Sequence, residues 1–256
     1  MTISIITASY NNIETIESTI QSVLTQTYPH IEYIVIDGGS TDGTVDIIKK
    51  YDTALTKWIS EPDRGIYDAL NKGIAMATGD IIGFLHADDV LHDYFVIASV
   101  MRLFCEKRCK AVYGDLVYVA RNDMNNIIRF WKSCPFHPQL LQQGWMPPHP
   151  TLFVQKEIYD QLGTFNTDMR IAADYDMILR FFKHPGFHSE YLPHVLVRMR
   201  IGGVSNKSIG NMLRKSKEDY KAMKSNNIGG FRSLVWKNLS KLSQLQIFRR
   251  QLRIIE

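Results

Sequence analysis

The sequence predicts an α/β protein with a mostly parallel, mixed central sheet between helices, followed by a basic helical tail. Short runs rich in Ile, Val, Tyr and Trp recur through the first half of the chain, and a helical pattern separates each run from the next. Strands that alternate with helices in this way form right-handed βαβ crossovers. Polar side chains follow four of these runs, at the ends where such sheets bind ligands.

The expected elements alternate in chain order. Strands are predicted over residues 3–8, 31–37, 57–60, 80–85 and 111–118. Apolar side chains at helical spacing predict helices over 13–26, 44–51, 66–77 and 94–106. After residue 120 the pattern is less regular, and we expect a proline-rich loop at 145–150, a strand at 151–154, and helices at 156–162 and 174–183.

The composition fits one large domain with a tail. A chain of 256 residues with 45% hydrophobic content can bury a full α/β core. We expect one domain over 1–205 and a basic amphipathic extension over 206–256. The extension carries twelve Lys and Arg against three Asp and Glu, so it faces different surroundings from the acidic remainder.

Targeting signals and cysteine pairs are not apparent in the sequence. The N-terminus shows no basic segment with a cleavage site, and no apolar run reaches the roughly 18 to 20 residues of a membrane span. Cys105, Cys109 and Cys134 have no CxxC spacing. These features predict a cytoplasmic protein in a reducing compartment.

One apolar run ends in acidic side chains. Residues 81–85 are followed by His86, Ala87, Asp88 and Asp89. Mg²⁺ and Mn²⁺ prefer oxygen ligands, and one or two carboxylates hold them while substrate phosphates complete the shell. This segment therefore indicates a nucleotide-diphosphate site. The alternative is that the two aspartates open a turn or cap the helix that begins near Tyr94.

Four motifs occur together in a recognisable order. They are the opening segment 4–11, the glycine-containing segment 37–44, the segment 80–89, and Ala173-Asp174-Tyr175-Asp176. In this order they resemble the family 2 glycosyltransferases over roughly residues 2–205, which implies a GT-A-type, Rossmann-like fold. The resemblance also implies that 1–205 is a catalytic domain, with a nucleotide-sugar half at about 1–110 and an acceptor half at about 111–205. Residues 61–73 are especially similar to bacterial enzymes that build O-antigen, capsule or exopolysaccharide repeat units.

The resemblance implies where the nucleotide sugar binds. The nucleoside pocket would include Tyr10 against the base and Asp37 accepting from its edge, unless Tyr10 is a turn residue packed on the sheet. By the same resemblance Arg64 and Asp68 would lie near the diphosphate and ribose, with Lys72 on the same helix as a weaker candidate. The alternative for Asp68 and Lys72 is an exposed salt pair between them. The full implied donor set is Ala8, Ser9, Tyr10, Asp37, Arg64, Asp68, Lys72, Ala87 and Asp88.

The metal motif departs from the family pattern. The family has DxD, and here the first position is His86. By the resemblance Asp88 is the direct ligand, with Asp89 or His86 in support. Imidazole suits Mn²⁺ better than Mg²⁺. We therefore expect Mn²⁺ (or Mg²⁺) as the cofactor, with Mn²⁺ supporting the higher activity.

The implied catalytic base is Asp174. It matches the aspartate of the family's Glu-Asp motif, although the preceding residue is Ala173. A carboxylate within hydrogen-bond reach can take the proton of an attacking hydroxyl, and a single in-line displacement inverts the anomeric carbon. Asp176 is the second choice. A helix N-cap is the structural alternative for Asp174, and the two roles are compatible.

Two further residues are weaker candidates near the acceptor or diphosphate. His149 lies in the proline-rich loop, where a plain surface histidine is the alternative. Arg200, followed by residues 202–205, resembles a late loop that closes over the donor, where Arg would complement phosphate charge. The chain lacks the Gln-x-x-Arg-Trp motif and the membrane helices of processive synthases, so we expect one sugar per encounter.

The tail combines apolar and basic side chains over residues 231–255. Such a helix can lie on an anionic membrane surface, which suits an undecaprenyl-diphosphate-linked acceptor at the inner face of the bacterial inner membrane. The alternative is that its apolar stripe packs on the catalytic domain or forms a homodimer.

The predicted function is an inverting, non-processive hexosyltransferase of EC 2.4.1 type. It would use UDP-glucose or UDP-galactose in O-antigen or related lipopolysaccharide synthesis. The alternatives are a polyprenyl-phosphate glycosyltransferase and a non-catalytic basic module for membrane or nucleic acid. The clustered acids Asp37, Asp88 and Asp174 disfavour nucleic acid, and the absence of G-x-G-x-x-G after the first strand disfavours a dinucleotide-binding oxidoreductase. Donor sugar, acceptor sugar and linkage are left open.

Overall fold

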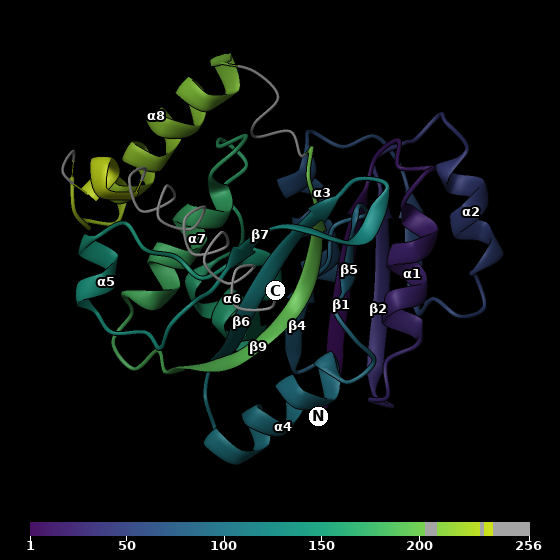
Figure 1. Ribbon diagram of the computed structural model, residues 1–256, viewed down its shortest axis with the longest axis horizontal. Coiled ribbons are helices and arrows are strands. Elements are labelled where there is room, and N and C mark those ends of the chain that lie inside the picture. Colours follow the sequence, from purple (N-terminus) through teal and green to yellow (C-terminus); the bar gives the residue numbers. More distant parts are fainter. Residues whose placement is uncertain (203–208, 231–232, 238–256) are drawn as a thin grey trace, which may run out of the picture.

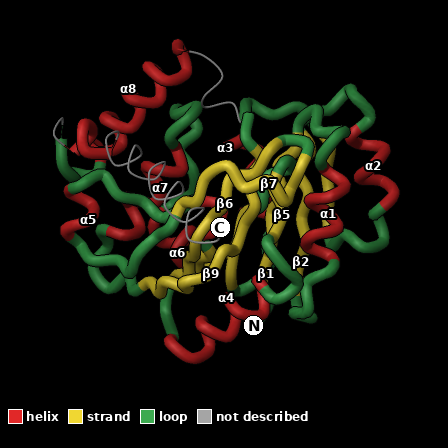
Figure 2. The backbone as a smooth tube through the Cα atoms, in the orientation of Figure 1, coloured by secondary structure: helices red, strands yellow, loops and turns green. Residues whose placement is uncertain are grey.

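A central mixed sheet with helices on both faces forms the body of the protein, in a computed structural model that describes residues 1–202, 209–230 and 233–237 (Figure 1; strands are yellow in Figure 2). Along the sheet the strand order is β3-β2-β1-β4-β8-β6-β9-β5, and β7 pairs with β6. The strands are β1 (Ile3–Ser9), β2 (Ile31–Asp37), β3 (Lys57–Ser60), β4 (Ile81–Phe84), β5 (Asp89–Leu91), β6 (Ala111–Ala120), β7 (Asp123–Trp131), β8 (Phe153–Gln155) and β9 (Ser189–Arg200).

Helices cover the two faces of the sheet separately. Alternate side chains of each strand point to opposite faces, so Ile6 and Ile34 pack toward α3 and α7, and Ile5 and Val35 toward α1 and α4. The helices are α1 (Ile16–Leu24), α2 (Thr44–Lys50), α3 (Ile66–Met76), α4 (Val96–Lys107), α5 (Gln139–Gln142), the 3₁₀ turn η1 (His149–Thr151), α6 (Lys156–Leu162), α7 (Ala173–Phe182) and α8 (Ile209–Ser225).

The first three strands, β1, β2 and β3, are parallel, and their carboxyl ends lie side by side. Ser9 lies opposite Asp37 on β2, and Asp37 lies opposite Ser60 on β3. The carboxyl ends of these strands are therefore level, and the loops that follow them share one side of the sheet. This confirms the predicted α/β class and its mixed, helix-flanked sheet.

Three strands were not expected from the sequence. β7 is a mostly exposed edge strand with a polar start, so it shows little apolar alternation. β9 contains Pro193 and several charged side chains, yet it pairs in parallel with β6 and antiparallel with β5. β5 has only three residues. Each of these strands is specified by its neighbours in the sheet more than by its own pattern.

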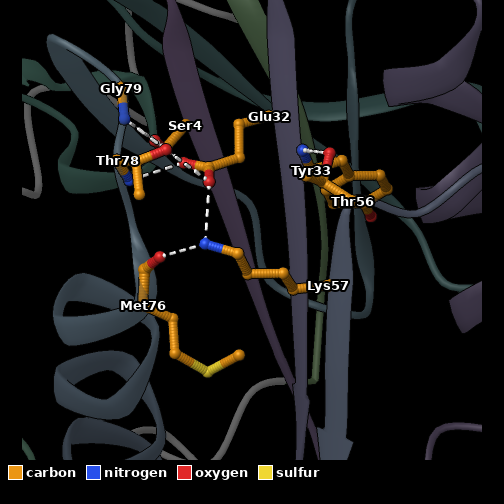
Figure 3. A network of polar contacts seen from close by, with 8 residues as sticks. All are labelled: Ser4, Glu32, Tyr33, Thr56, Lys57, Met76, Thr78 and Gly79. Atoms are coloured by element: carbon orange, nitrogen blue, oxygen red, sulfur yellow. Dashed lines mark hydrogen bonds and ion pairs between the residues drawn. The ribbon is translucent and has the colours of Figure 1, made fainter.

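A buried carboxylate, that of Glu32, holds the first three strands together at their amino ends. Glu32 accepts hydrogen bonds from the Ser4 hydroxyl (2.5 Å), the Thr78 backbone N–H (2.7 Å) and the Lys57 ammonium (3.2 Å), as Figure 3 shows. Burial alone would raise the pKa of Glu32, but these donors lower it to about 2. The network ties the starts of β1, β2 and β3 to the end of α3, so it holds the sheet at the end away from the predicted site.

The start of the predicted tail packs on the preceding part of the chain. Helix α8 lies along α7 (Figure 1). Lys237, in a helical turn at residues 233–237, forms a buried ion pair of 2.8 Å with Asp219 of α8, and its ammonium lies over the ring of Tyr175 on α7. Most of the segment 231–255 lies outside the described residues. Among the described residues, no helix is long and apolar enough to cross a membrane.

Candidate active site

The predicted nucleoside pocket lies at the ends of β1 and β2. Ala8 and Ser9 are buried at the end of β1, whereas the Tyr10 side chain is 62% exposed. A side chain at Gly38 would collide with Asp63 and touch the Tyr10 ring, so glycine permits the two loops to meet. Tyr10, Gly38 and Asp63 therefore form one corner with an accessible aromatic face. Asp63 was not singled out from the sequence, because only the fold brings its loop to Gly38.

Asp37 organises the loop that follows β2. Its carboxylate accepts hydrogen bonds from the backbone N–H groups of Gly39 (3.0 Å) and Ser40 (2.9 Å) and from the hydroxyls of Ser40 (2.5 Å) and Ser60 (2.7 Å). The side chain is fully buried. These four hydrogen bonds give Asp37 a loop-shaping role in addition to the expected contact with a nucleobase.

The basic residues of the next loop have local partners. Arg64 is 81% exposed at its side chain and pairs with Asp68 at 3.0 Å, and this guanidinium lowers the pKa of Asp68. Lys72 pairs with Glu61 at 2.7 Å. The alternative salt pair between Asp68 and Lys72 is thus replaced by two other pairs. Both basic side chains lie on the loop and helix that follow β3.

Three candidate residues from distant parts of the chain meet in one cluster. His86 follows β4, His149 begins η1, and Asp174 is the second residue of α7. Nε2 of His86 lies 3.2 Å from Nε2 of His149, and Nδ1 of His149 lies 3.3 Å from Oδ2 of Asp174. His149 is therefore not a plain surface histidine.

The protonation of this cluster follows from its contacts. Burial lowers the pKa of His149 to about 4, and burial also lowers the pKa of His86, so both rings are neutral at pH 7. Each neutral ring has one N–H. A donor meets an acceptor at both contacts only when His149 carries its proton on Nδ1, beside Asp174, and His86 carries its proton on Nε2. We assign the tautomers from this network.

Tyr67 of α3 holds Asp174 from the other half of the domain. Its hydroxyl donates to the carbonyl of Ile171 (2.8 Å) and lies 3.2 Å from Oδ1 of Asp174. Burial, followed by the charge of Asp174, raises the pKa of Tyr67 well above its usual range, so the phenol keeps its proton. Tyr67 was not identified from the sequence. The residues around Tyr67 form no motif that indicates a contact with Asp174, because the two residues are more than 100 positions apart in the sequence.

Asp88 and Asp89 have different surroundings. Among the described residues, the Asp88 carboxylate makes no hydrogen bond or ion pair, and its backbone carbonyl accepts from the Arg200 guanidinium (2.7 Å). Asp89 is fully buried at the start of β5 and accepts from the Arg200 backbone N–H (3.2 Å). Burial, and then the Asp88 charge, raise the pKa of Asp89 well above its usual range. Only Asp88 is thus available to an incoming cation.

Arg200 and Asp176 both lie in supporting positions. Arg200 is the last residue of β9, is buried, and also donates to the Ser18 hydroxyl at 3.1 Å. The residues after Gly202 in the predicted closing loop lie outside the described ranges. Asp176 is buried against Arg180 (3.4 Å) and the Asn226 side-chain amide (2.9 Å). The structure does not bring Asp176 to the histidine cluster.

A divalent metal fits this site only with help from a substrate. In the described part of the chain, no group of three His, Cys, Asp or Glu side chains is arranged to hold a metal ion. Asp88 offers one carboxylate that no protein group in the described residues engages, and Nδ1 of the nearby His86 is buried without a partner there. A hard cation held by one carboxylate takes its remaining ligands from phosphate and water. The donor set therefore fits a cation that arrives with a diphosphate.

A separate cavity adjoins the site. It has a volume of about 320 Å³ and lies between the start of α1, the β6–β7 hairpin and the end of β9. Arg121 and Arg200 are among its lining residues, but Asp88, His149 and Asp174 are not. These three candidate site residues therefore lie outside this cavity.

The mixed sheet, its flanking helices and the loops at the carboxyl ends of its strands have the architecture of a GT-A-type glycosyltransferase. The sequence model of glycosyl transferase family 2 matches residues 4–163. The chain belongs to this family, and it is a transferase. This confirms the resemblance on which the site residues were chosen.

Two relatives come from Mycobacterium tuberculosis. An uncharacterized glycosyltransferase is 34% identical over 181 residues, which cover 70% of this chain and 68% of the relative. A PGL/p-HBAD biosynthesis glycosyltransferase is 30% identical over 209 residues, which cover 79% of this chain and 78% of the relative.

Solved structures share the fold at low identity. TarS 1-349 from S. aureus, in complex with UDP-GlcNAc, matches with a TM-score of 0.67 and 16% identity over 88% of this chain and 65% of that chain. A mannosyltransferase from Pyrobaculum calidifontis, in complex with GDP-Man and Mn²⁺, matches with a TM-score of 0.63 and 20% identity over 87% of this chain and 63% of that chain. This chain thus spans just under two thirds of either solved chain.

The contact between Tyr67 and Asp174 leads to a first prediction. We expect Tyr67→Phe to lower kcat for glycosyl transfer by roughly tenfold, the size of effect expected when a catalytic group loses part of its orientation. The KM for the donor should stay the same, because the Tyr10 corner is unchanged. Steady-state kinetics measure both, with Tyr94→Phe, an exposed tyrosine, as the control. Equal kcat values for Tyr67→Phe and the wild type would contradict the orienting role.

Proposed function

We propose that this protein is an inverting, metal-dependent hexosyltransferase that transfers one sugar per encounter from a UDP-sugar to a lipid-diphosphate-linked saccharide in surface polysaccharide synthesis. The observation that carries the proposal is the meeting of Asp174, His149 and His86 beside Asp88 at the carboxyl edge of the sheet. In this proposal Asp174 is the general base and Asp88 is the metal-binding carboxylate of the same site. The exposed Tyr10 follows β1, the strand that pairs with β4.

The reaction follows from the chemistry of these residues. Asp174 accepts the proton of the acceptor hydroxyl as that hydroxyl attacks the anomeric carbon. His149 and Tyr67 orient its carboxylate. When bound, Mn²⁺ or Mg²⁺ would neutralise charge on the departing diphosphate, with Asp88 and the nearby His86 to hold it. No enzyme nucleophile is needed, so the configuration at the anomeric carbon inverts.

Several observations support the choice of donor. The exposed Tyr10 ring beside Gly38 and Asp63 offers a surface on which a nucleobase can stack. Arg64 and Lys72 are basic side chains that can approach a diphosphate after exchanging their present carboxylate partners. The UDP-GlcNAc in the TarS structure supports a uridine donor. Glucose or galactose remains the proposed sugar.

The acceptor and location are proposed from the relatives and from the surface of α8. The name of the relative in PGL/p-HBAD biosynthesis supports a role in surface glycan assembly. On α8, Met212 and Leu213 are exposed apolar residues, and Arg214, Lys217 and Lys221 are exposed basic ones. Such a face suits the anionic inner face of the bacterial inner membrane. A homodimer through this face is the alternative.

The test is a transfer assay on a panel of donors. The full chain is incubated with Mn²⁺ or with EDTA, a synthetic GlcNAc- or GalNAc-diphosphate-lipid, and each of several UDP- and GDP-sugars. We expect transfer from one UDP-hexose, with inversion seen by NMR of the product and loss of activity in EDTA. Transfer to a bare polyprenyl phosphate would replace the proposed acceptor. No transfer from any donor together with no UDP binding would overturn the proposal.

A further inference from the structure

A single carboxylate on α8 binds the segment that leads into α7. Glu218 accepts hydrogen bonds from the backbone N–H groups of Arg170 (3.2 Å), Ile171 (2.8 Å) and Ala172 (3.0 Å). Three consecutive N–H groups that converge in this way form a concave anion-binding nest. Here the anion is a side chain from an element about 46 to 48 residues further along the chain.

This contact lies immediately before the proposed base. Helix α7 begins at Ala173, and its N-cap residue Ala172 provides no side-chain cap. Glu218 supplies an acceptor for the Ala172 N–H, and its negative charge lies at the positive end of the helix. Asp174 is the second residue of that helix. The position of its carboxylate therefore depends on how residues 170–172 are held.

The same segment is held from two sides. Tyr67 of α3 donates to the Ile171 carbonyl and lies against Oδ1 of Asp174, while Glu218 of α8 binds the Ile171 N–H. The backbone carbonyl and the backbone N–H of Ile171 are thus bound by side chains from two different helices. Removing either side chain frees one side of the loop that precedes Asp174.

Two buried contacts fix the position of α8 on α7. The Asn226 amide donates to Asp176 at 2.9 Å, and Asp219 pairs with Lys237 over the ring of Tyr175. Asp219 is the neighbour of Glu218, so this ion pair fixes the turn of α8 that carries Glu218. These contacts do not involve residues 170–172 or Glu218, so we expect them to remain when Glu218 is replaced.

We propose that Glu218 is a positioning residue for Asp174, so that α8 is part of the catalytic support and not only a surface extension. This inference rests on the proposed function, because it assumes that Asp174 is the base. The carboxylate of Glu218 holds the 170–172 turn and thereby keeps the Asp174 carboxylate against His149. Glu218 does not itself contact Tyr10, Asp37 or Asp88, so donor binding should be independent of it.

The experiment compares Glu218→Gln and Glu218→Asp with the wild type. Lys217→Gln, an exposed residue on the same helix, is the matched control. We expect Glu218→Gln to lower kcat by roughly ten- to a hundredfold, with the KM for the donor and the Kd for UDP unchanged. Glu218→Asp should recover part of the loss, because it restores the charge. Amide hydrogen exchange at residues 170–172 should quicken in Glu218→Gln and stay slow in the control.

Two results obtained with an intact fold would overturn the inference. One is unchanged exchange at 170–172 in Glu218→Gln, which would mean that the carboxylate does not hold the turn. The other is faster exchange with wild-type kcat, which would mean that the contact is only structural. A joint fall in kcat, Tm and UDP affinity would overturn it as well, because Glu218 would then support the whole fold and not residues 170–172 in particular. Failure of the proposed function is distinct, because the wild type would then bind no UDP and transfer no sugar, while the exchange result would stand.

Discussion

Asp174→Asn is expected to lower kcat for sugar transfer by roughly 10²- to 10⁴-fold, the usual contribution of a general base. The amide keeps the size of the side chain. Its oxygen can accept from the His149 Nδ1–H while its NH2 group donates to the Tyr67 hydroxyl, which itself donates to the Ile171 carbonyl, so the cluster should retain its shape. It cannot take a proton from the acceptor hydroxyl at neutral pH. Binding of UDP should be unchanged, because the Tyr10 corner lies on another loop.

Steady-state transfer assays and UDP titration separate these effects. Asp168→Asn is the matched control, since Asp168 is an exposed carboxylate on the loop before α7. A fall in kcat for Asp174→Asn with no change in UDP affinity identifies the base. If Asp174→Asn retains activity and Asp176→Asn does not, the base has been assigned to the wrong carboxylate of this helix.

Asp88→Ala is expected to abolish the response of the transfer rate to metal. Asp88 carries the carboxylate beside His86 that is not engaged by protein groups in the described part of the chain. Removing it leaves no anionic ligand for a cation at that position, so the rate at saturating Mn²⁺ should fall to the level of wild type in EDTA. Asp160→Ala, an exposed carboxylate on α6, should respond to Mn²⁺ as the wild type does.

His86, two residues before Asp88, adds a metal preference to this prediction. Wild type should transfer faster with Mn²⁺ than with Mg²⁺, because imidazole suits Mn²⁺ better. His86→Asp restores the acidic first position and should bring the two rates closer together. Titration of both metals against both proteins measures the ratio. Equal transfer rates with Mn²⁺ and Mg²⁺ in the wild type would contradict a role for His86 as a metal ligand. Its contact with His149 would then be its role in the site.

The local pattern was sufficient to predict the first half of the fold. Strands at residues 3–8 and 31–37 agree closely with β1 and β2, because each is a buried run that reads as a strand in isolation. Helix α1 begins at Ile16 instead of residue 13, because Asn11 to Thr15 form a turn that includes a left-handed Asn11. β9 was missed since its charged and proline-containing sequence is stabilised by pairing with β6 and β5.

The site was predicted only in part for the same reason. Motif resemblance identified Asp88, His149 and Asp174 as separate candidates, and the fold brings His149 against Asp174. The residues that hold them, Tyr67 and Glu218, carry no motif that points to the site. Their partners lie more than 40 residues away along the chain, so their roles depend on contacts that no local pattern encodes.

The sequence by itself determined the α/β class, the family and the chemistry that the site residues can perform, because strand and helix patterns and side-chain types are local properties. Only the tertiary structure decided that Asp88 and Asp89 have different surroundings, that Asp176 points toward α8, and that Glu218 binds the turn before Asp174. These outcomes depend on burial and on which backbone groups meet across the fold. Local sequence patterns do not reveal such long-range contacts, because the contacts form only when the helices pack on the sheet.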